Sequence, residues 1–509
     1  MATDDTLSNL IESAKDSQEA RWVSPLVPSL SGIDPLGMRQ TNFDLMDKVL
    51  PGLNNTARHI RPFTVVAWAW WKAARLASAT GRKKIAPDLL VNFVDRIEVV
   101  FAWSQFVRSS SAELPGRNVL APLINAERYK FGGALWKSRR RERRYSTALS
   151  APVNYGPSLK NLGWIGPHGR ERTVFIPNDA AIPAIEALDV RLQSCLDHPL
   201  FTSFDEVTVE QSLVDEVGEA WAMERLTEPE RRFVRDTLVG ELSRPVLKQG
   251  ISLVSQALRS FDSEPGIPDL RRTMAEPDSG IIHSSSLVPT SVAWKVIQLR
   301  QVFRLAMESL LHWAVLKLRD GTHTTAQLTR VFVAESGSAA NVAKWLASSR
   351  LPGGPVDWLS NLQESLADGD TAPLAKSIRA TIASLSAEPL SLTSADERQD
   401  RLPLSKAVGE LQRFYSLHPV ELLAHVIERW VFGQHVYWAL GRGLSDARGN
   451  QRRIFRLKVA LEEAGWTLTS GTRAGPANAP SPTPDRLYTA VTLIRECRLL
   501  QHKAQPPTN

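Results

Sequence analysis

Cysteine is scarce in this chain of 509 residues, which contains only Cys195 and Cys497. The two lie far apart, and neither belongs to a CxxC pair or to a cysteine–histidine pair with metal-ligand spacing. This pattern excludes a disulfide framework and argues against a structural zinc site. Reduced thiols are typical of proteins in the cytoplasm, and we therefore expect a cytoplasmic location.

Long apolar runs are also missing. The nearest candidate covers residues 63–71, where nine residues precede Lys72. A membrane-spanning helix needs about 20 apolar residues. Residues 1–17 are polar and carry four acids at places where a secretory signal needs an apolar core. We expect a soluble protein with no spanning helix, no secretory signal and no membrane partner.

The motifs of familiar enzyme classes are absent. The sequence has no GxSxG nucleophile elbow, and the basic loop at 441–450 lacks the GxxxxGK[ST] pattern of a phosphate-binding loop. The closest histidines, His418, His425 and His435, lack the i, i+4 spacing that places two metal ligands on one helix face. We therefore assign no catalytic residue, metal ligand or cofactor.

Charge is the feature that stands out. The formal net charge is +7, and residues 128–144 alone contain eight basic residues against one acid. Residues 197–244 contain twelve acids against five bases. Separated blocks of opposite charge indicate an anionic partner at one face. At the other they indicate a basic partner or the protein's own basic face.

Hydrophobic periodicity predicts long helices. Residues 57–80 carry apolar side chains in both helical phases, which is typical of a helix that is buried on most sides. Residues 87–108 place large apolar side chains near one face, and residues 291–318 repeat theirs at steps of three or four. We therefore expect a mainly α, multi-helical fold.

Breaks in this pattern suggest boundaries. At about 100–200 residues per domain, the chain has room for about three domains. A Pro-, Gly- and Ser-rich stretch is the strongest candidate for a linker. The expected organisation is an N-terminal helical domain at 1–114, a basic winged-helix-like unit at 115–195, an acidic helical segment at 196–261, a linker at 262–290 and a C-terminal helical domain at 291–509.

The unit at 115–195 has the pattern of a winged helix. Helical segments and the basic run precede two short strand-like stretches, which a turn at 166–169 connects. We predict that residues 164–176 form the wing. The short, proline-bounded segment at 151–162 is the candidate recognition element, whose polar side chains could reach base edges or phosphates.

Arginine clusters neutralise phosphates through forked hydrogen bonds, and nearby aromatic rings can stack on bases. We therefore expect this unit to bind nucleic acid, with double-stranded DNA as the preferred partner. The predicted binding residues are Lys137, Arg139, Arg140, Arg141, Arg143, Arg144, Tyr155, Lys160, Arg170 and Arg172. The alternatives are a solvated basic face, or a docking site for the protein's own acidic block.

A second basic cluster lies near the C-terminal end, in a predicted basic helix at 442–461. A surface helix face is the preferred interpretation, although a glycine-flanked basic loop can also cradle phosphates. The residues of this secondary basic patch are Arg448, Arg452, Arg453 and Arg456.

The segment at 49–68, VLPGLNNTARHIRPFTVVAW, resembles the opening of uncharacterised bacterial families with a PG…T…R…F…W start. Such families continue with a basic stretch and a helix–wing unit, as here at 137–176, and their genes accompany restriction and phage-defence systems. The resemblance covers about the first 190 residues and implies a defence-associated DNA-binding subunit. It carries over no catalytic residue.

We therefore expect a non-catalytic, DNA-binding subunit of a bacterial multi-protein system, with further proteins of that system as partners. One alternative is a protein-interaction scaffold, in which the acidic block and the C-terminal helices bind a partner protein. A second alternative is a metal-dependent nuclease of an unrecognised type.

Overall fold

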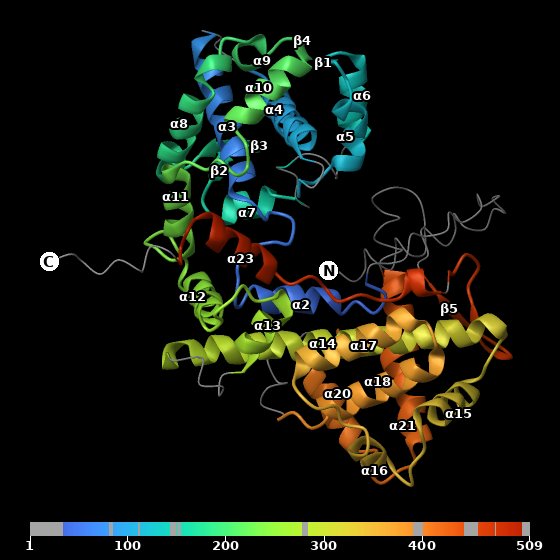
Figure 1. Ribbon diagram of the computed structural model, residues 1–509. Coiled ribbons are helices and arrows are strands. Elements are labelled where there is room, and N and C mark those ends of the chain that lie inside the picture. The colour runs from blue at the N-terminus through green and yellow to red at the C-terminus, as the bar shows by residue number, and fades with distance from the viewer. Residues whose placement is uncertain are drawn as a thin grey trace, which may run out of the picture. The chain divides into compact units, whose positions relative to one another are not determined.

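The computed structural model describes residues 34–80, 85–109, 112–142, 149, 154–169, 171–276, 284–389, 401–441, 457–473 and 475–500. The chain is mainly helical, and the strands of this part pair as three two-stranded antiparallel sheets (Figure 1). The predicted fold class is therefore confirmed at the level of a mainly α protein. No helix within these ranges is both long and apolar enough to cross a membrane.

The described residues form two compact units. The larger unit consists of 40–301, 353–356 and 482–500, and the smaller unit of 34–39, 302–352, 357–473 and 475–481. The larger unit includes the described residues of the regions predicted as winged-helix-like, acidic and linker.

The larger unit holds most of the short elements. Its elements are α2 (Arg39–Met46), α3 (Ile60–Ala79), α4 (Pro87–Arg108), α5 (Arg117–Ile124), β1 (Arg128–Phe131), α6 (Ala134–Glu142), α7 (Gly156–Asn161), β2 (Ile165–His168), β3 (Glu171–Pro177), η1 (Asp179–Ala181), α8 (Ile182–Arg191), η2 (Gln193–Cys195), α9 (Pro199–Thr202), β4 (Val207–Glu210), α10 (Gln211–Ala220), α11 (Glu228–Leu238), α12 (Pro245–Arg259), α13 (Ile267–Ala275), η3 (Ser285–Leu287) and α23 (Leu487–Glu496).

The smaller unit is built from helices and one hairpin, and α14 (Val288–Lys317) contributes residues to both units. Its further elements are η4 (Leu318–Asp320), α15 (Thr325–Ser336), α16 (Val342–Ala347), α17 (Pro355–Asp368), α18 (Thr371–Leu385), α20 (Leu404–Gln412), α21 (Pro419–His425), the π-helical η6 (Val426–Gly433), β5 (Val459–Glu462), β6 (Gly465–Leu468) and η7 (Pro476–Asn478).

Helix α3 is the core of the larger unit, as its two-phase apolar pattern predicts. It packs against α4, α8 and β3, and Figure 1 shows it between α8 and α4. Trp68 is fully buried, and its indole N–H donates to Asp189 Oδ1 on α8 at 2.8 Å. Trp70 meets Phe175 of β3 edge to face. Large aromatic side chains thus join α3 to its neighbours and bury the apolar surface that stabilises the unit.

The two predicted wing strands pair with each other. Strands β2 and β3 are antiparallel, with Ile165 opposite Pro177 and a register shift after Pro167. Gly169, in the connecting turn, has a φ of 54°, a left-handed conformation that glycine adopts without steric cost. A hairpin therefore forms where the sequence predicts one.

Strands β1 and β4 form a pairing that the sequence did not indicate. Arg128 lies opposite Glu210 and Phe131 opposite Val207. This sheet joins the start of the basic run to the acidic segment, which are far apart in the chain. Within the predicted linker, residues 267–275 form helix α13, in which Leu270 and Met274 are fully buried.

The smaller unit confirms one predicted helix and corrects another. Helix α14 forms where the sequence predicts a helix at 291–318. Its side chains are buried on all sides of the helix rather than along one apolar stripe. The predicted basic helix at 442–461 is wrong at its end, because 459–462 form strand β5, paired with β6. Residues 442–456 lie outside the described residues, and so does the secondary basic patch at Arg448, Arg452, Arg453 and Arg456.

Candidate functional site

Helix α6 carries the described part of the basic run. Trp136 anchors this helix, since it is 1% exposed and meets Phe131 of β1 edge to face at 5.0 Å between ring centroids. Its indole N–H donates to Asn92 Oδ1 on α4 at 2.7 Å. Lys137, the next residue, is exposed. The buried indole of Trp136 therefore fixes the position of α6, on which Lys137 and the following basic residues lie.

The remaining residues of the run are described in part. Arg139, Arg140 and Arg141 belong to α6, where their backbone is helical. Arg143 and Arg144, like Arg170 at the predicted wing tip, lie outside the described residues.

Tyr155 is a correction, because it cannot stack on a base from its position. The ring is fully buried and meets Phe63 of α3 edge to face at 4.9 Å, while its hydroxyl oxygen accepts from the His59 N–H at 3.3 Å. Asn154 and Ser158 are also buried. The short helix α7 is therefore a packing element over most of its length.

Two predicted contact residues remain accessible on the hairpin side. Lys160 is exposed at the end of α7, with its Nζ 4.4 Å from the centroid of the Phe175 ring, and Arg172 is exposed on β3. Figure 1 shows this hairpin and α6 apart, with α4 between them in that view. The structure does not bring the basic helix and the hairpin together into one surface.

An ion pair beside the β1–β4 sheet joins the acidic segment to the basic segment at 128–144. Glu206 pairs with Lys130 at 2.7 Å, and its carboxyl pKa is lowered mainly by the hydrogen bond and charge of Lys130, with a smaller contribution from Lys137. Both partners of this pair are at least half exposed, so it contributes little stability. The pair lies beside β1 and involves Lys130 rather than the run at 137–144.

Other acids of this segment pair elsewhere in the larger unit. Glu230 pairs with Arg61 at 3.0 Å, with both side chains fully buried. Glu219 and Glu224 both pair with Arg108 at the end of α4, at 2.6 and 3.2 Å. Three acids of the block are therefore paired with bases on α3 and α4.

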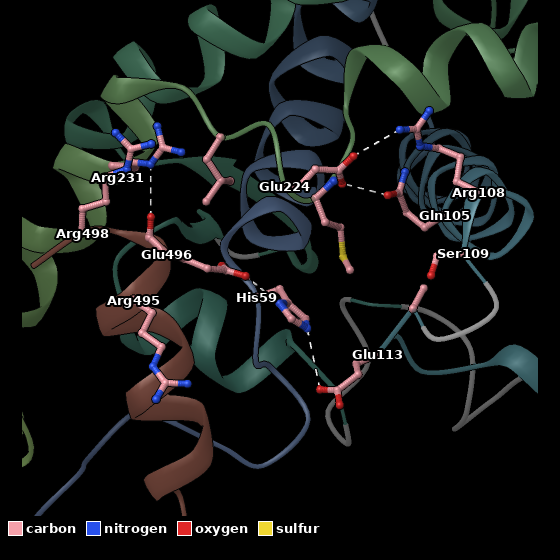
Figure 2. Close-up of a pocket in the computed structure, with 13 residues that line it drawn as sticks. His59, Gln105, Arg108, Ser109, Glu113, Glu224, Arg231, Arg495, Glu496 and Arg498 are labelled. Carbon is pink, nitrogen blue, oxygen red and sulfur yellow. Dashed lines mark hydrogen bonds and ion pairs between the residues drawn. The ribbon is translucent and has the colours of Figure 1, made fainter. Parts of the chain in front are cut away.

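A pocket of about 660 Å³ lies within the larger unit, and no motif in the sequence indicated it. We call it the arginine pocket. Its wall comes from the end of α4 and the residues that follow, the start of α3, the loop before α11, α11 itself and the end of α23. The lining residues are His59, Gln105, Arg108, Ser109, Ala112, Glu113, Met223, Glu224, Leu226, Arg231, Arg495, Glu496 and Arg498 (Figure 2).

His59 is held at the centre of this wall. Its Nδ1 lies 2.7 Å from Glu496 Oε1, and the other carboxylate oxygen accepts from the Ile60 N–H at 2.8 Å. Glu496 thereby satisfies the first free N–H of α3 and fixes the imidazole plane. The His59 Nε2 is buried, lies 3.8 Å from Glu113 Oε2 and makes no hydrogen bond.

The histidines near the C-terminal end have structural hydrogen bonds. His418 Nδ1 accepts from the Val420 N–H at 3.3 Å, and His425 Nε2 lies 3.0 Å from Glu410. His435 bridges two backbone segments. Within the described ranges, no three His, Cys, Asp or Glu side chains are grouped so that they could hold a metal ion.

The chain matches no protein-family model, and neither a curated protein nor a solved structure matches it. The functional argument therefore depends on the chain's own residues.

Proposed function

We propose that this protein is a nucleic-acid-binding, non-catalytic subunit and that helix α6 contacts the phosphates of double-stranded DNA. The observation that carries this proposal is the anchoring of α6 by the buried Trp136, directly before the basic residues at 137 and 139–141. A fixed helix spaces successive residues by about 1.5 Å, so charges on it can follow a phosphate backbone. The resemblance at 49–68 supports a place in a bacterial defence system.

The β2–β3 hairpin supplies a second set of contacts in this proposal, through Lys160, Arg170 and Arg172. The hairpin, α7 and the neighbouring helices would act as the winged-helix-like unit. Because α6 lies apart from the hairpin, the two surfaces would meet different stretches of a duplex. Neither surface needs to read bases, since phosphate contacts alone give affinity without sequence preference.

Fluorescence anisotropy with a labelled duplex, measured across a salt series, tests the proposal. The test variant is Lys137/Arg139/Arg140/Arg141→Ala, which removes four positive charges from α6. The control is Lys248/Arg259/Lys344/Arg350→Ala, which removes four positive charges from exposed positions elsewhere.

Wild type and the control should bind alike, with affinity that falls steeply as salt rises. If all four residues contact phosphates, the α6 variant should lower the slope of log K against log salt by about 3 to 4. If both variants lost the same affinity, the loss would come from the change in net charge, and the assignment of α6 as the contact surface would be overturned. Adding Mg²⁺ or Mn²⁺ to the bound duplex tests the nuclease alternative in the same samples.

The second candidate is a protein-interaction adaptor, which is favoured by a specific feature of the same helix. Leu135 of α6 is 60% exposed, next to the buried Trp136. An exposed leucine beside arginines is typical of a protein interface, in which arginine is enriched. Leu135→Ser should leave DNA affinity unchanged under the first proposal and should abolish co-purification with a neighbouring gene product under the second.

A further inference from the structure

The arginine pocket is not used by the proposed function, and it has the size of a ligand site. Its volume of about 660 Å³ lies within the roughly 300–1,000 Å³ that is usual for small-molecule sites. Its lining combines charged groups with the apolar side chains of Met223 and Leu226. Such a mixture suits a molecule with one charged end and one organic end.

Three arginines besides Arg108 line this pocket. Figure 2 shows Arg231 and Arg498 next to each other, across from Arg108, whereas the guanidinium group of Arg495 lies apart from theirs, below Glu496. Arginine presents a rigid fork of donors that matches the oxygens of a phosphate group. The two neighbouring guanidinium groups of Arg231 and Arg498 suit a phosphate dianion better than a single carboxylate.

The acids that line the pocket are already engaged by other partners. Glu113 pairs with Arg58 at 3.0 Å, and Glu224 with Arg108 at 3.2 Å. Glu496 accepts from the Ile60 N–H and from His59. Its side chain is thus committed to the start of α3, and Arg231 reaches only its backbone carbonyl oxygen, at 3.2 Å. Arg495 is also paired, with Glu264 at 2.7 Å. The carboxylates therefore leave Arg231 and Arg498 available to an outside anion.

Arg498 adopts an unusual backbone conformation to reach this wall. Its φ is 57°, and it follows the end of α23 in a Schellman motif, with Leu499 N–H donating to Ile494 O at 3.0 Å and Arg498 N–H to Arg495 O at 3.0 Å. Glycine is the residue favoured at this position, and another side chain there costs about 1–2 kcal/mol. Among the described residues no carboxylate pairs with Arg498.

Arg495 and Arg498 also suit the negative end of the α23 dipole, so their charges alone do not require a ligand. Arg231 does not fit that explanation. It is the fourth residue of α11, close to the positive end of that helix, where a cation is disfavoured. The wall also contains the buried Nε2 of His59, which has no hydrogen-bond partner. An anion in the pocket would compensate the charge of Arg231.

From these contacts we propose that the arginine pocket binds a phosphorylated small molecule of nucleotide size. The phosphate lies against Arg231 and Arg498, and the organic part lies against Met223 and Leu226.

Isothermal titration of the full chain with AMP tests this proposal, with adenosine and pyrophosphate as parallel probes. AMP should bind one molecule per chain, pyrophosphate should bind the same site and displace it, and adenosine should bind at least tenfold more weakly. Equal binding of adenosine and AMP would overturn the phosphate assignment. The absence of a heat signal with both AMP and pyrophosphate at millimolar concentration would overturn the site itself.

Arg498→Gly is the sharpest variant, because glycine is the preferred residue at this backbone position and the fold should be retained. It should weaken AMP binding at least tenfold while the melting temperature stays the same or rises. Arg231→Ala should have a similar effect on binding, and Arg498→Lys should restore part of it. Arg259→Ala, an exposed arginine outside the pocket, is the matched control and should bind AMP as wild type does. Unchanged affinity in Arg498→Gly would overturn the proposal.

Discussion

At the residue scale, burial decides what the aromatic and titratable side chains can do. Tyr155 and Trp136 stand near basic residues in the sequence, which suggested stacking on nucleic acid. In the structure both rings are at most 1% exposed and serve as anchors for α7 and α6. Burial raises the pKa of the Tyr155 hydroxyl well above its ordinary value. These rings are therefore parts of the core rather than contact residues.

His435 gives a prediction at this scale. It is 1% exposed, its Nδ1 lies 2.9 Å from Pro35 O, and its Nε2 accepts from the Lys458 N–H at 2.8 Å. Only the neutral ring can make both bonds, and burial, with a smaller effect from the Lys458 charge, lowers its pKa to about 4. The unfolded chain therefore takes up the proton first as pH falls from about 6.5 to about 4, and stability is lost across that range. We expect a loss of up to about 3 kcal/mol, measured by urea unfolding at a series of pH values.

The variant His435→Asn separates this residue from other buried groups. It should be less stable than wild type at pH 7.5 but should lose less stability between pH 7 and pH 4.5. Glu308 acts in the opposite direction, because burial raises its pKa, and the comparison with wild type cancels its contribution. If the free energy of unfolding fell equally with pH in both proteins, His435 would not control the pH dependence.

At the element scale, one buried ion pair joins two helices of the larger unit. Arg61 of α3 and Glu230 of α11 are both fully buried, with 3.0 Å between their charged groups. Glu230 also completes a capping box with Thr227 at the start of α11. Desolvation lowers the pKa of Arg61, and the charge of Glu230 opposes that effect. Removing one partner would leave a buried charge alone, which costs more than the pair contributes.

We therefore expect Glu230→Gln to destabilise the larger unit by about 3 kcal/mol or more, measured by urea unfolding. Thr227→Ala, which removes only the cap, should cost about 1 kcal/mol. The double variant Arg61→Met/Glu230→Met should be more stable than Glu230→Gln, since no unpaired charge remains. A double variant at least as unstable as Glu230→Gln would contradict the buried-charge explanation.

At the scale of the whole molecule, the opposite charge blocks are not two free faces. The acidic segment is paired with Arg61, Arg108 and Lys130, all in the larger unit. A core made from segments at both ends of the chain holds this arrangement in place.

The reactivity of the two thiols measures whether that core stays closed. Cys195 and Cys497 are at most 3% exposed, and burial raises the pKa of both, that of Cys497 to about 12. Since the thiolate is the reactive form, we expect neither to react readily with Ellman's reagent at pH 8 in the native protein. Both should react within minutes in 6 M guanidinium chloride. Rapid reaction of Cys497 without denaturant would show that the end of α23 opens, which would also remove one wall of the arginine pocket.

The sequence by itself determined the helical class, the range of α4, the position of α14 and the hairpin at 165–177. These features depend on local periodicity and turn residues, which act between neighbours in the chain. The basic run at 137–144 is equally local, because charge density is visible without a fold.

Only the tertiary structure decided which side chains are accessible and which distant segments meet. Tyr155 is buried because α3 covers it, and β1 pairs with β4 across the larger unit. The arginine pocket brings His59 to Glu496, 437 positions away in the sequence. No local pattern encodes such a meeting, because it depends on how the apolar faces of several helices pack at once. The sequence thus fixes the elements, and packing decides which of their residues form a site.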